Sequence, residues 1–421
     1  MSRPIRIAIS GGGLAGASLL QALLQYPHLD VHIFESAPAF KEAGLAIGIT
    51  RNAQAALDLI GPPAPQLLKR AGAVPMQGVR FMIAEGEGVG KVINEVDNSK
   101  GTRLTSIVHR AAYLQQLLAD VPEVRMHSSK KLERISHNSD SVSMHFTDGT
   151  SHECDILVGA DGIHSVVRKC VLGEDDPAAH PRNTGFWIVM SLQPYDKARA
   201  SLGEGLINSN DAREYSWVGD GTYILHNVLS DGQLVQFVIG SSDEKPTDQW
   251  HRTVSADEIK KLYTGWPAEL RKAVNELLGQ EPEQQGIYLW EHPPARTYAS
   301  GPVCVMGDAA HATTPWHGSG GGMSIEDSLI LSTLLGRSKT PSEARASLKA
   351  YDHVRRPRTQ RIVESSRETG MMLLGKGGQT RMEMKKAGNL LRRWDFILDL
   401  DMLEHRNEAI RAMIDELAVS A

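Results

Sequence analysis

The sequence is poor in the features that mark secreted, disulfide-bonded and membrane-spanning proteins. Its 421 residues include three cysteines, Cys154, Cys170 and Cys304, none of them in C-x-x-C spacing. We therefore expect reduced core thiols in a cytoplasmic protein and no metal site. No apolar run approaches the ~20 residues that cross a bilayer, and a strand is expected already at residue 5. We accordingly expect neither a membrane span nor a signal peptide.

Positive charge is also scarce. The chain has 45 Lys and Arg against 50 Asp and Glu, a net charge of −5, and its pI is near 6.4. Domains that bind nucleic acids are usually basic, so we expect no nucleic-acid partner. At a prior of about 150 residues per domain, the length predicts two or three domains with ample core. The composition agrees with a soluble enzyme. We expect a monomer or a homodimer, and the sequence does not distinguish them.

Glycine, in contrast, is placed in a distinctive pattern near the N-terminus. Gly11, Gly13 and Gly16 lie between an apolar run at residues 5–9 and helical spacing over residues 14–24. In a strand–turn–helix unit, such glycines permit a tight turn, a close backbone approach to a pyrophosphate, and close helix–strand packing. The phosphate then lies at the helix N-terminus. The pattern predicts a nucleotide-binding loop.

An acidic residue at the next strand end completes this unit. Residues 31–34 predict a second strand, and Glu35 follows it about 20 residues beyond the glycines. At this place an acidic side chain accepts hydrogen bonds from ribose hydroxyls. The loop and Glu35 together predict a dinucleotide site.

Two later segments carry related signatures. A buried strand over residues 156–161 leads into Asp161, Gly162 and Arg168, in the pattern D-G-x-x-S-x-x-R. The run 303–306 leads into Gly307 and Asp308. Three signatures in this order predict FAD held by a discontinuous domain, and hence an oxidoreductase. The rest of the last signature consists of His311, Pro315 and a glycine-rich turn at 318–322 followed by Glu326 and Asp327.

The region between the second and third signatures has a different character. Residues from about 176 to 290 contain aromatic and β-branched runs that are typical of antiparallel strands. We expect an FAD-binding domain in two parts, residues 1–175 and 291–370, with a substrate-binding sheet domain at 176–290 between them. A helical segment, 371–421, closes the chain.

On these motifs the chain resembles the single-component FAD-dependent aromatic hydroxylases, the class A flavoprotein monooxygenases, and within them the salicylate-hydroxylase-like branch. The resemblance covers nearly the whole chain. It implies an α/β fold: a split Rossmann-like FAD domain of the glutathione-reductase type, with an inserted antiparallel (α+β) sheet domain and C-terminal helices.

The resemblance also assigns roles to residues. It implies that Asp308 binds the ribityl chain and that backbone around Gly318 and Gly321 faces the isoalloxazine ring. The cofactor-binding residues that we expect are Gly11, Gly13, Gly16, Glu35, Gly48, Arg110, Asp161, Gly307, Asp308, Pro315, Gly318 and Gly321.

The implied chemistry consumes NADH or NADPH and O₂. Hydride reduces the flavin, a C4a-hydroperoxide forms, and an electrophilic oxygen is transferred to an electron-rich aromatic ring. The chain must orient the ring, help to ionise its phenol and exclude water. We expect a phenolic aromatic acid as the substrate, with decarboxylating hydroxylation of the salicylate type as the specific hypothesis.

The sequence leaves open which residue activates the phenol. His226 lies on an expected strand of the sheet domain and is a candidate base, because histidine titrates near neutral pH. A lone histidine on an apolar strand can equally be structural. Tyr223 is the second candidate, and at three positions' distance it faces the opposite side of a regular strand.

The anchor for a substrate carboxylate is also open. Relatives in the salicylate branch commonly show an arginine after the first aromatic strand of the sheet domain, whereas residues 185–190 are apolar here. Arg51, Arg182 and Arg213 are the nearby alternatives. For the arginine-rich stretch at 355–367, a solvated helical face is the interpretation that we favour.

Two other functions fit a flavin-binding chain. One is an FAD-dependent reductase of an unsaturated small molecule, which inserts no oxygen. The other is a flavin-bound redox sensor without catalytic turnover. The segment from His311 to Pro315, with the glycine turn after it, favours the monooxygenase.

Overall fold

The computed structural model describes residues 3–41, 46–61, 64–97, 103–137, 141–208, 210, 212–243, 247–374 and 392–420. A six-stranded sheet with the order β19-β20-β12-β1-β2-β8 forms the core of one half. All its neighbours pair in parallel except β19 with β20. Its strands are β1 (Ile5–Ser10), β2 (Leu29–Phe34), β8 (Met126–His127), β12 (Ile156–Gly159), β19 (Ala299–Ser300) and β20 (Val303–Val305).

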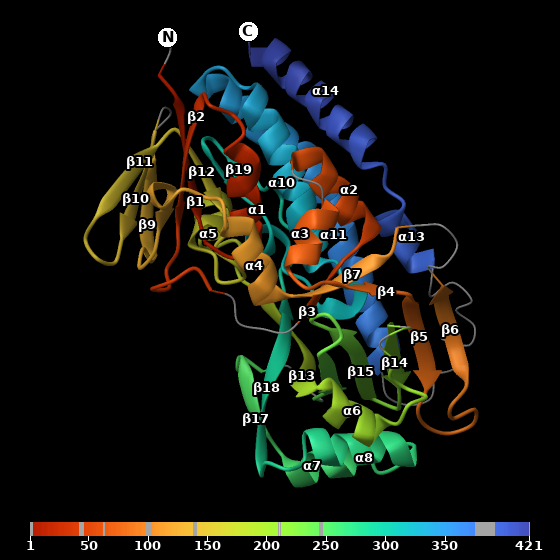
Figure 1. Cartoon of the computed structure of the whole chain (residues 1–421). Helices are drawn as coiled ribbons and strands as arrows, with labels where there is room; N and C mark the ends of the chain where they lie inside the picture. Colours follow the sequence, from red (N-terminus) through yellow and green to blue (C-terminus); the bar gives the residue numbers. More distant parts are fainter. Residues whose placement is uncertain are drawn as a thin grey trace.

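The three expected signatures follow three adjacent strands of this sheet. β1, β12 and β20 lie side by side and parallel, so their carboxyl ends share one edge. Buried helices cover the sheet, with α1 packed on α10 (Figure 1). The helices of this half are α1 (Leu14–Leu23), α2 (Arg51–Ile60), α3 (Ala64–Arg70), α4 (Arg110–Leu118), α5 (Val166–Leu172), α9 (Asp308–His311) and α10 (Gly320–Arg337).

The second half is built on an eight-stranded sheet with the order β17-β18-β13-β16-β15-β14-β5-β6. Apart from the parallel pair β14–β5, its neighbours are antiparallel. Its strands are β5 (Gly78–Ile83), β6 (Val92–Asp97), β13 (Arg182–Pro194), β14 (Arg213–Val218), β15 (Thr222–Leu229), β16 (Leu234–Ser242), β17 (His251–Ser255) and β18 (Glu283–Glu291).

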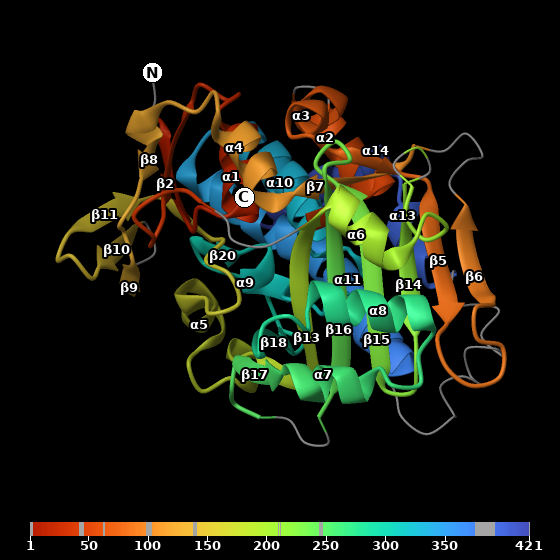
Figure 2. The same ribbon diagram turned by 60° about the horizontal axis from the view of Figure 1, so that its bottom comes forward.

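This sheet is apolar on both faces. One face packs against α6 (Tyr195–Leu202), α7 (Ala256–Leu262) and α8 (Ala268–Leu277), which lie in front of the strands in Figure 2. The other face turns toward η3 (Pro315–His317) and the long helix α11 (Pro341–Leu374). A strand between two such layers buries both sets of alternating side chains, so its sequence shows no polar face.

Two smaller sheets complete the described strands. β3 (Ala46–Ile49), β7 (Thr105–His109) and β4 (Val74–Met76) form one of them, and β7 also contacts β15 of the large sheet. β9 (Leu132–His137), β10 (Val142–Phe146) and β11 (Ser151–Cys154) form the other. β10 and β11 form an antiparallel hairpin, and Gly149 in its turn has φ +82°.

The expected α/β fold is confirmed, but the sheet domain draws on more of the chain than residues 176–290. β5 and β6 lie within residues 1–175, which were assigned to the FAD-binding domain, yet β5 pairs with β14 and β6 pairs with β5 at the sheet edge. Strand pairing across more than 100 residues leaves no local signal in the sequence. The four-part division otherwise stays a proposal.

The C-terminal helices pack on the first half. α14 (Met402–Ser420) lies along α11, and α13 (Arg392–Leu398) contacts α2 (Figure 1). Residues 375–391 of the expected helical segment lie outside the described residues. In the described chain no helix is both long and apolar enough to traverse a bilayer. The cysteines are free thiols; Cys154 and Cys304 are buried and Cys170 is partly buried.

Candidate active site

The glycines of the first and third signatures bring distant segments into contact. A Cβ on Gly11, which has φ +107°, would stand 2.2 Å from the carbonyl oxygen of Ala160 at the end of β12. A Cβ on Gly307, with φ +58°, would stand 2.7 Å from the Cβ of Ala15 in α1. Both positions combine left-handed backbone with a close approach that glycine alone allows. The three signatures therefore meet at one edge of the parallel sheet.

The first signature has the geometry of a dinucleotide loop. Gly13 precedes α1 without a side-chain cap, and the first turn of the helix carries no acidic residue. A Cβ on Gly16 would stand 2.0 Å from the Gly11 carbonyl oxygen, so this glycine lets helix and strand pack closely. The Glu35 carboxylate accepts hydrogen bonds from the backbone N–H groups of Gly12 and Ala37, both at 2.7 Å. It thus lies beside the loop, where a ribose would reach it.

Asp161 acts mainly on its own backbone. Its carboxylate accepts hydrogen bonds from the Ser165 hydroxyl at 2.5 Å and from the N–H groups of Val166 at 2.9 Å and Val167 at 3.2 Å. Burial raises the pKa of Asp161 against the opposing effect of these bonds. The side chain therefore shapes the turn at Gly162, which has φ +74° and open space around it.

Arg168, the last residue of the second signature, is a buried structural residue. Its guanidinium is fully buried and donates to the carbonyl oxygens of Ala178, Ala309 and Ala310 at 2.7, 3.0 and 2.6 Å. Burial lowers its pKa to about 10. Because two of these carbonyls belong to α9, Arg168 fixes the helix that presents Asp308.

Three residues of the third signature are exposed, so that a ligand can reach them. Asp308 begins α9 and is exposed, as are Pro315 and Gly318. Gly318 has φ +60°, and a Cβ added there would meet no atom within 4 Å. The Asp308 carboxylate makes no hydrogen bond to the described residues, and it stands at a helix start beside an open glycine turn. Such a carboxylate fits a ligand with hydroxyl groups.

The glycine turn at the start of α10 faces β3. A Cβ on Gly321 would stand 3.5 Å from Ile47, and a Cβ on Gly322 would stand 3.5 Å from the Thr50 hydroxyl. That hydroxyl is buried and has no hydrogen-bond partner among the described residues. An orphaned hydroxyl opposite a helix N-terminus suits a planar ring with polar edges. These residues fit the isoalloxazine of FAD.

Gly48 and Arg110 lie at the same edge of the site. Gly48 is in β3, opposite Ile107 of β7, and Arg110 begins α4 directly after β7. The twelve expected cofactor residues thus lie along the three signatures and the β3–β7 pair, and the Asp161 carboxylate is bonded within its own turn. Their roles in cofactor binding stay a prediction.

A buried charge cluster fixes the glycine turn and corrects one interpretation. Arg355 is fully buried, and it bonds the carboxylates of Glu326 at 2.7 Å and Asp327 at 2.8 Å. Arg358 bonds Glu326 through two nitrogens at 2.8 Å, and His311 lies 2.6 Å from Asp327. The hypothesis of a solvated arginine face is wrong for Arg355 and Arg358, because the carboxylates of α10 lie opposite them.

The pKa values of this cluster follow from competing effects. Burial alone would raise the pKa of Glu326, but Arg358 and Arg355 together lower it well below its usual range. His311 and Arg355 likewise lower the pKa of Asp327 against the effect of burial. Glu326 and Asp327 therefore stay ionised at neutral pH, and the cluster ties α9, α10 and α11 together.

The structure places the two candidate bases on opposite faces of the large sheet, as expected from their spacing. Tyr223 faces η3, where its ring meets Trp316 at a centroid distance of 5.4 Å and an angle of 86°. His226 faces the helices α6 and α8; it is fully buried and stacks on Tyr215 at 5.0 Å. The structure therefore does not bring His226 to the flavin site.

The electrostatics of His226 lead to the same correction. Burial lowers its pKa to about 3, and its Nε2 accepts a hydrogen bond from the indole of Trp217 at 3.3 Å. A neutral ring behind the sheet has no path to a substrate on the other face. The hypothesis of a catalytic base on β15 is retained only for Tyr223.

Each of the three arginines considered as an anion anchor is paired with a carboxylate of the chain. Arg182 bonds Glu291 at 2.6 Å, Arg213 bonds Glu95 at 2.8 Å, and Arg51 bonds Asp399.

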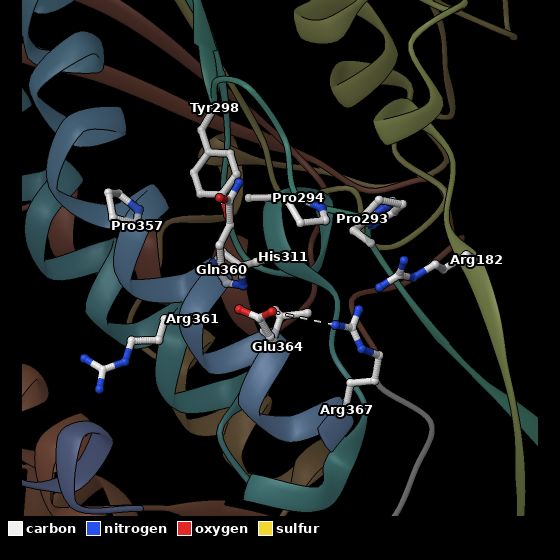
Figure 3. Close-up of a pocket in the computed structure, with 13 residues that line it drawn as sticks. Arg182, Pro293, Pro294, Tyr298, His311, Pro357, Gln360, Arg361, Glu364 and Arg367 are labelled. Carbon is white, nitrogen blue, oxygen red and sulfur yellow. Dashed lines mark ion pairs between the residues drawn. The ribbon is translucent and has the colours of Figure 1, made fainter. Parts of the chain in front are cut away.

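A cavity of about 280 Å³ lies apart from the glycine-lined site, between α11 and residues 292–298 (Figure 3). Arg182 and Arg367 point toward each other at one end of it, and both bond Glu291. Its lining includes no residue of the glycine turn and not Asp308. The cavity touches the third signature only at Ala310 and His311, so it is separate from the cofactor site that we expect along the three signatures.

Sequence reasoning missed two residues of the site. Thr50 precedes α2 in a segment that was weighed for Gly48 and Arg51, and Met190 lies in a run that was noted for lacking an arginine. Met190 is 38% exposed in the middle of β13, on the face that carries Tyr223, so this face is not fully covered. An exposed methionine inside a sheet has no sequence signal.

Comparison with known proteins gives consistent matches over the whole chain. The family described as FAD binding domain matches residues 5–366. A 6-methylsalicylate 1-monooxygenase of Aspergillus terreus is 38% identical, and the alignment covers 87% of this chain and 82% of the relative's chain. A salicylate hydroxylase of Pseudomonas putida is 32% identical over 96% of this chain and 95% of its own. A solved salicylate hydroxylase–substrate complex is 25% identical, with a TM-score of 0.83, over 96% of this chain and 98% of that chain.

Proposed function

The chain belongs to the FAD-dependent monooxygenases of the FAD binding domain family, and from this premise we propose that it hydroxylates a 2-hydroxybenzoate with loss of the carboxyl group as CO₂. The resemblance to FAD-dependent aromatic hydroxylases is confirmed by these relatives. FAD is the cofactor, with a nicotinamide nucleotide and O₂ as co-substrates. The relatives named above act on salicylates by name, which supports the same substrate class here.

The three signatures hold FAD in this proposal. Gly11, Gly13 and Gly16 admit the pyrophosphate at the start of α1, Glu35 binds the adenosine ribose, and Asp308 binds the ribityl chain. When bound, the flavin accepts electrons from the nicotinamide nucleotide and uses O₂ to supply an electrophilic oxygen atom.

The start of α10 provides the electrostatics at the ring end. Ser319 precedes the helix without a side-chain cap, and the glycines after it leave their N–H groups accessible. These dipoles stabilise negative charge that develops on a bound ring system, at a position fixed by the buried cluster of Glu326, Asp327 and Arg355.

The uncovered part of the large sheet receives the aromatic substrate. Met190 and Leu225 lie on this face, with Trp316 and Tyr223 forming perpendicular aromatic walls beside them. Apolar and aromatic surface suits a benzene ring and keeps water away from the reacting carbon. The single observation that carries the proposal is this partly uncovered apolar face opposite the glycine turn.

The experiment that tests the function follows three quantities on the purified holoenzyme. NAD(P)H loss, O₂ uptake and CO₂ release are measured with 2-hydroxybenzoate, 2-hydroxy-6-methylbenzoate, and benzoate as the control without a phenol. We expect equimolar changes and a catechol product with the first two compounds. NAD(P)H oxidation that yields only H₂O₂ with every hydroxybenzoate would overturn the proposal.

The two alternative functions gain no support. The relatives named above are hydroxylases or monooxygenases by name, whereas a reductase would reduce its substrate without consuming O₂. A sensor would show no turnover in the experiment just described. NADH or NADPH as reductant, and monomer or homodimer as assembly, stay open predictions.

A further inference from the structure

A carboxylate on the substrate-facing side of the large sheet has no role in the proposal above. Glu214 is the second residue of β14, and alternation along the strand places it with Ser216 and Val218 on the face of Tyr223. The intervening residues Tyr215 and Trp217 belong to the opposite, helix-covered face. Glu214 is therefore directed toward the substrate layer.

Hydrogen bonds connect this carboxylate to the aromatic wall of the site. The hydroxyl groups of Tyr223 and Ser216 are 2.8 Å apart, and the Ser216 hydroxyl donates to Glu214 Oε1 at 3.4 Å. Ser216 and Tyr223 are buried, with 1% and 5% of their surface exposed, whereas Glu214 is partly exposed. The hydrogen-bonded chain thus runs from the aromatic wall to a partly buried carboxylate.

We propose that Glu214 is the proton acceptor for the substrate phenol, and that Tyr223 and Ser216 relay the proton to it. This inference rests on the proposed function. The substrate O–H bond breaks as its proton passes to the Tyr223 oxygen. The Tyr223 proton passes to the Ser216 oxygen, and the Ser216 proton forms a new O–H bond at Glu214 Oε1. The electron pair stays on the substrate oxygen as a phenolate, which activates the ring toward an electrophile.

The protonation states suit these three roles. Burial raises the pKa of Glu214 to about 7, against a small lowering by the bond from Ser216. A base with a pKa near the working pH is the most effective kind. Burial first, and the charge of Glu214 second, raise the pKa of Tyr223, so its hydroxyl stays protonated and passes a proton on.

The arginines near Glu214 pair with other groups and not with its carboxylate. Arg80 and Arg213 both bond Glu95, and Arg80 also bonds Tyr215, on the face that points away from the substrate. On the inner face the neighbouring strands present Tyr223 and Asn227 from β15 and Gln236 from β16. In the part of the chain that the structure describes, no Lys, Arg or His forms an ion pair with Glu214.

Two isosteric variants test the relay. Glu214→Gln removes the acceptor, and Ser216→Ala breaks the chain between donor and acceptor. Matched controls are Glu95→Gln on β6 and Ser241→Ala on β16, whose hydroxyl bonds the Gly221 carbonyl on the opposite face. Retention of the bound-flavin spectrum and of Tm shows that each variant is folded.

The first measurement is the pH profile of product formation by the holoenzyme. In the wild type we expect the rate to fall below about pH 7, as Glu214 becomes protonated. We expect both variants to lose this acid limb and to slow product formation by about 10²–10⁴-fold, with more H₂O₂ per NAD(P)H. The controls keep the wild-type profile.

The second measurement needs no turnover. The ultraviolet difference spectrum of bound 2-hydroxybenzoate, recorded without NAD(P)H, reports the pH at which the bound phenol ionises. We expect Glu214→Gln and Ser216→Ala to raise this pH by more than one unit.

The outcomes separate the relay from the proposed function. Wild-type pH profiles and ionisation in Glu214→Gln overturn the relay. A loss in Glu214→Gln with none in Ser216→Ala also overturns it, because the carboxylate would then act without the serine. If Glu214→Gln fails to fold, Ser216→Ala alone decides. Ionisation of the bound phenol without any hydroxylated product refutes the proposed function instead.

Discussion

At the scale of single residues, the orientation of one side chain decides its role. Tyr223 and His226 are three positions apart on β15, and the alternation of the strand sends them to different layers. One meets Trp316 beside the glycine turn and the other stacks on Tyr215 under α8. A residue type suited to acid–base chemistry is therefore a catalytic candidate only when its face is known.

This placement predicts the effect of replacing His226. His226→Asn should leave FAD binding and the yield of H₂O₂ per NAD(P)H at wild-type values. It should destabilise the fold by about 1–3 kcal/mol, because the buried Trp217 N–H loses its acceptor. Chemical denaturation and the coupling ratio are the measurements. A clear rise in H₂O₂ would restore His226 as the base.

Asp308 offers a second prediction at this scale. It is exposed at the start of α9, whereas Asp327 nearby is fully buried and bonded. Asp308→Ala removes a charge-assisted hydrogen bond to the ribityl chain, with a typical worth of about 1.5–3 kcal/mol. We expect FAD affinity, measured by flavin fluorescence, to fall roughly 10- to 150-fold.

The control for Asp308 is an acidic residue in a comparable position without a ligand. Asp257 lies in the first turn of α7, and its side chain is 97% exposed. Asp257→Ala should leave FAD affinity unchanged. Equal affinities in the two variants would remove Asp308 from the cofactor site.

At the scale of elements, the buried cluster explains how a glycine-rich helix start keeps its position. α10 begins with three glycines, which supply no side-chain packing of their own. Glu326 and Asp327, two turns later, are held by Arg355 and Arg358 of α11, and Asn52 of α2 adds a bond at 2.7 Å. Fixed dipoles at the helix N-terminus require such support.

We therefore expect Arg355→Met to cost about 3–5 kcal/mol of unfolding free energy, because it leaves buried carboxylates without a counter-charge. Affinity for FAD should fall with it, since α10 loses its tie to α11. Arg361→Met is the control: Arg361 is exposed and lies over the ring of Phe396. Denaturant titration compares the two, and similar losses would show that the cluster contributes little.

The sequence predicts the parallel sheet and its loops well, because these depend on local order. The strand at 303–306, the helix that begins at Leu14 and the position of Glu35 beside the loop follow from runs and spacings within about 35 residues. Arg355 was misinterpreted because helical periodicity shows which residues share a face but not what packs against it.

Glu214 illustrates the same limit on a strand. Its neighbours Tyr215 and Trp217 look like the buried face, which would leave residues 214 and 216 in solvent. The missing information is the tertiary cover on the second face, which comes from η3, α11 and β7. A signal was present in the apolar residues on both faces of β15, since they indicate a strand buried on both sides.

At the scale of the whole molecule, two sheets of different kinds enclose the proposed cofactor and substrate layers. The parallel sheet presents its loops at one edge, and the large sheet presents one apolar face to the same region. β5 and β6 leave the first half to extend the second, so the chain crosses between the halves more often than a simple insertion requires. Long helix α11 spans both halves (Figure 1).

Deep burial of histidines also shapes the response of the whole molecule to acid. Burial lowers the pKa of His226 and His317 to about 3, of His292 to about 2 and of His405 to about 4. All four are at most 5% exposed. In the unfolded chain each regains an ordinary pKa near 6.5. Between these values the unfolded state binds more protons than the folded state.

The sign of the effect follows directly. Each depressed histidine contributes stability above about pH 6.5 that is lost as the pH falls toward its folded-state pKa, at about 1.4 kcal/mol per pH unit. The carboxyl groups of Glu214, Asp161 and Glu291 act in the opposite sense, because burial raises their pKa values, but the four histidines outnumber them. We expect Tm to fall steeply from pH 6.5 to pH 4.5 and to be nearly flat from pH 7 to pH 8. Replacing either His226 or His317 with Gln should reduce the number of protons taken up on unfolding by about one, so the unfolding free energy should fall less steeply with acid. The same change at the exposed His251 should leave this dependence unchanged. A slope that is unchanged in both buried variants would show that these rings are already protonated in the folded protein.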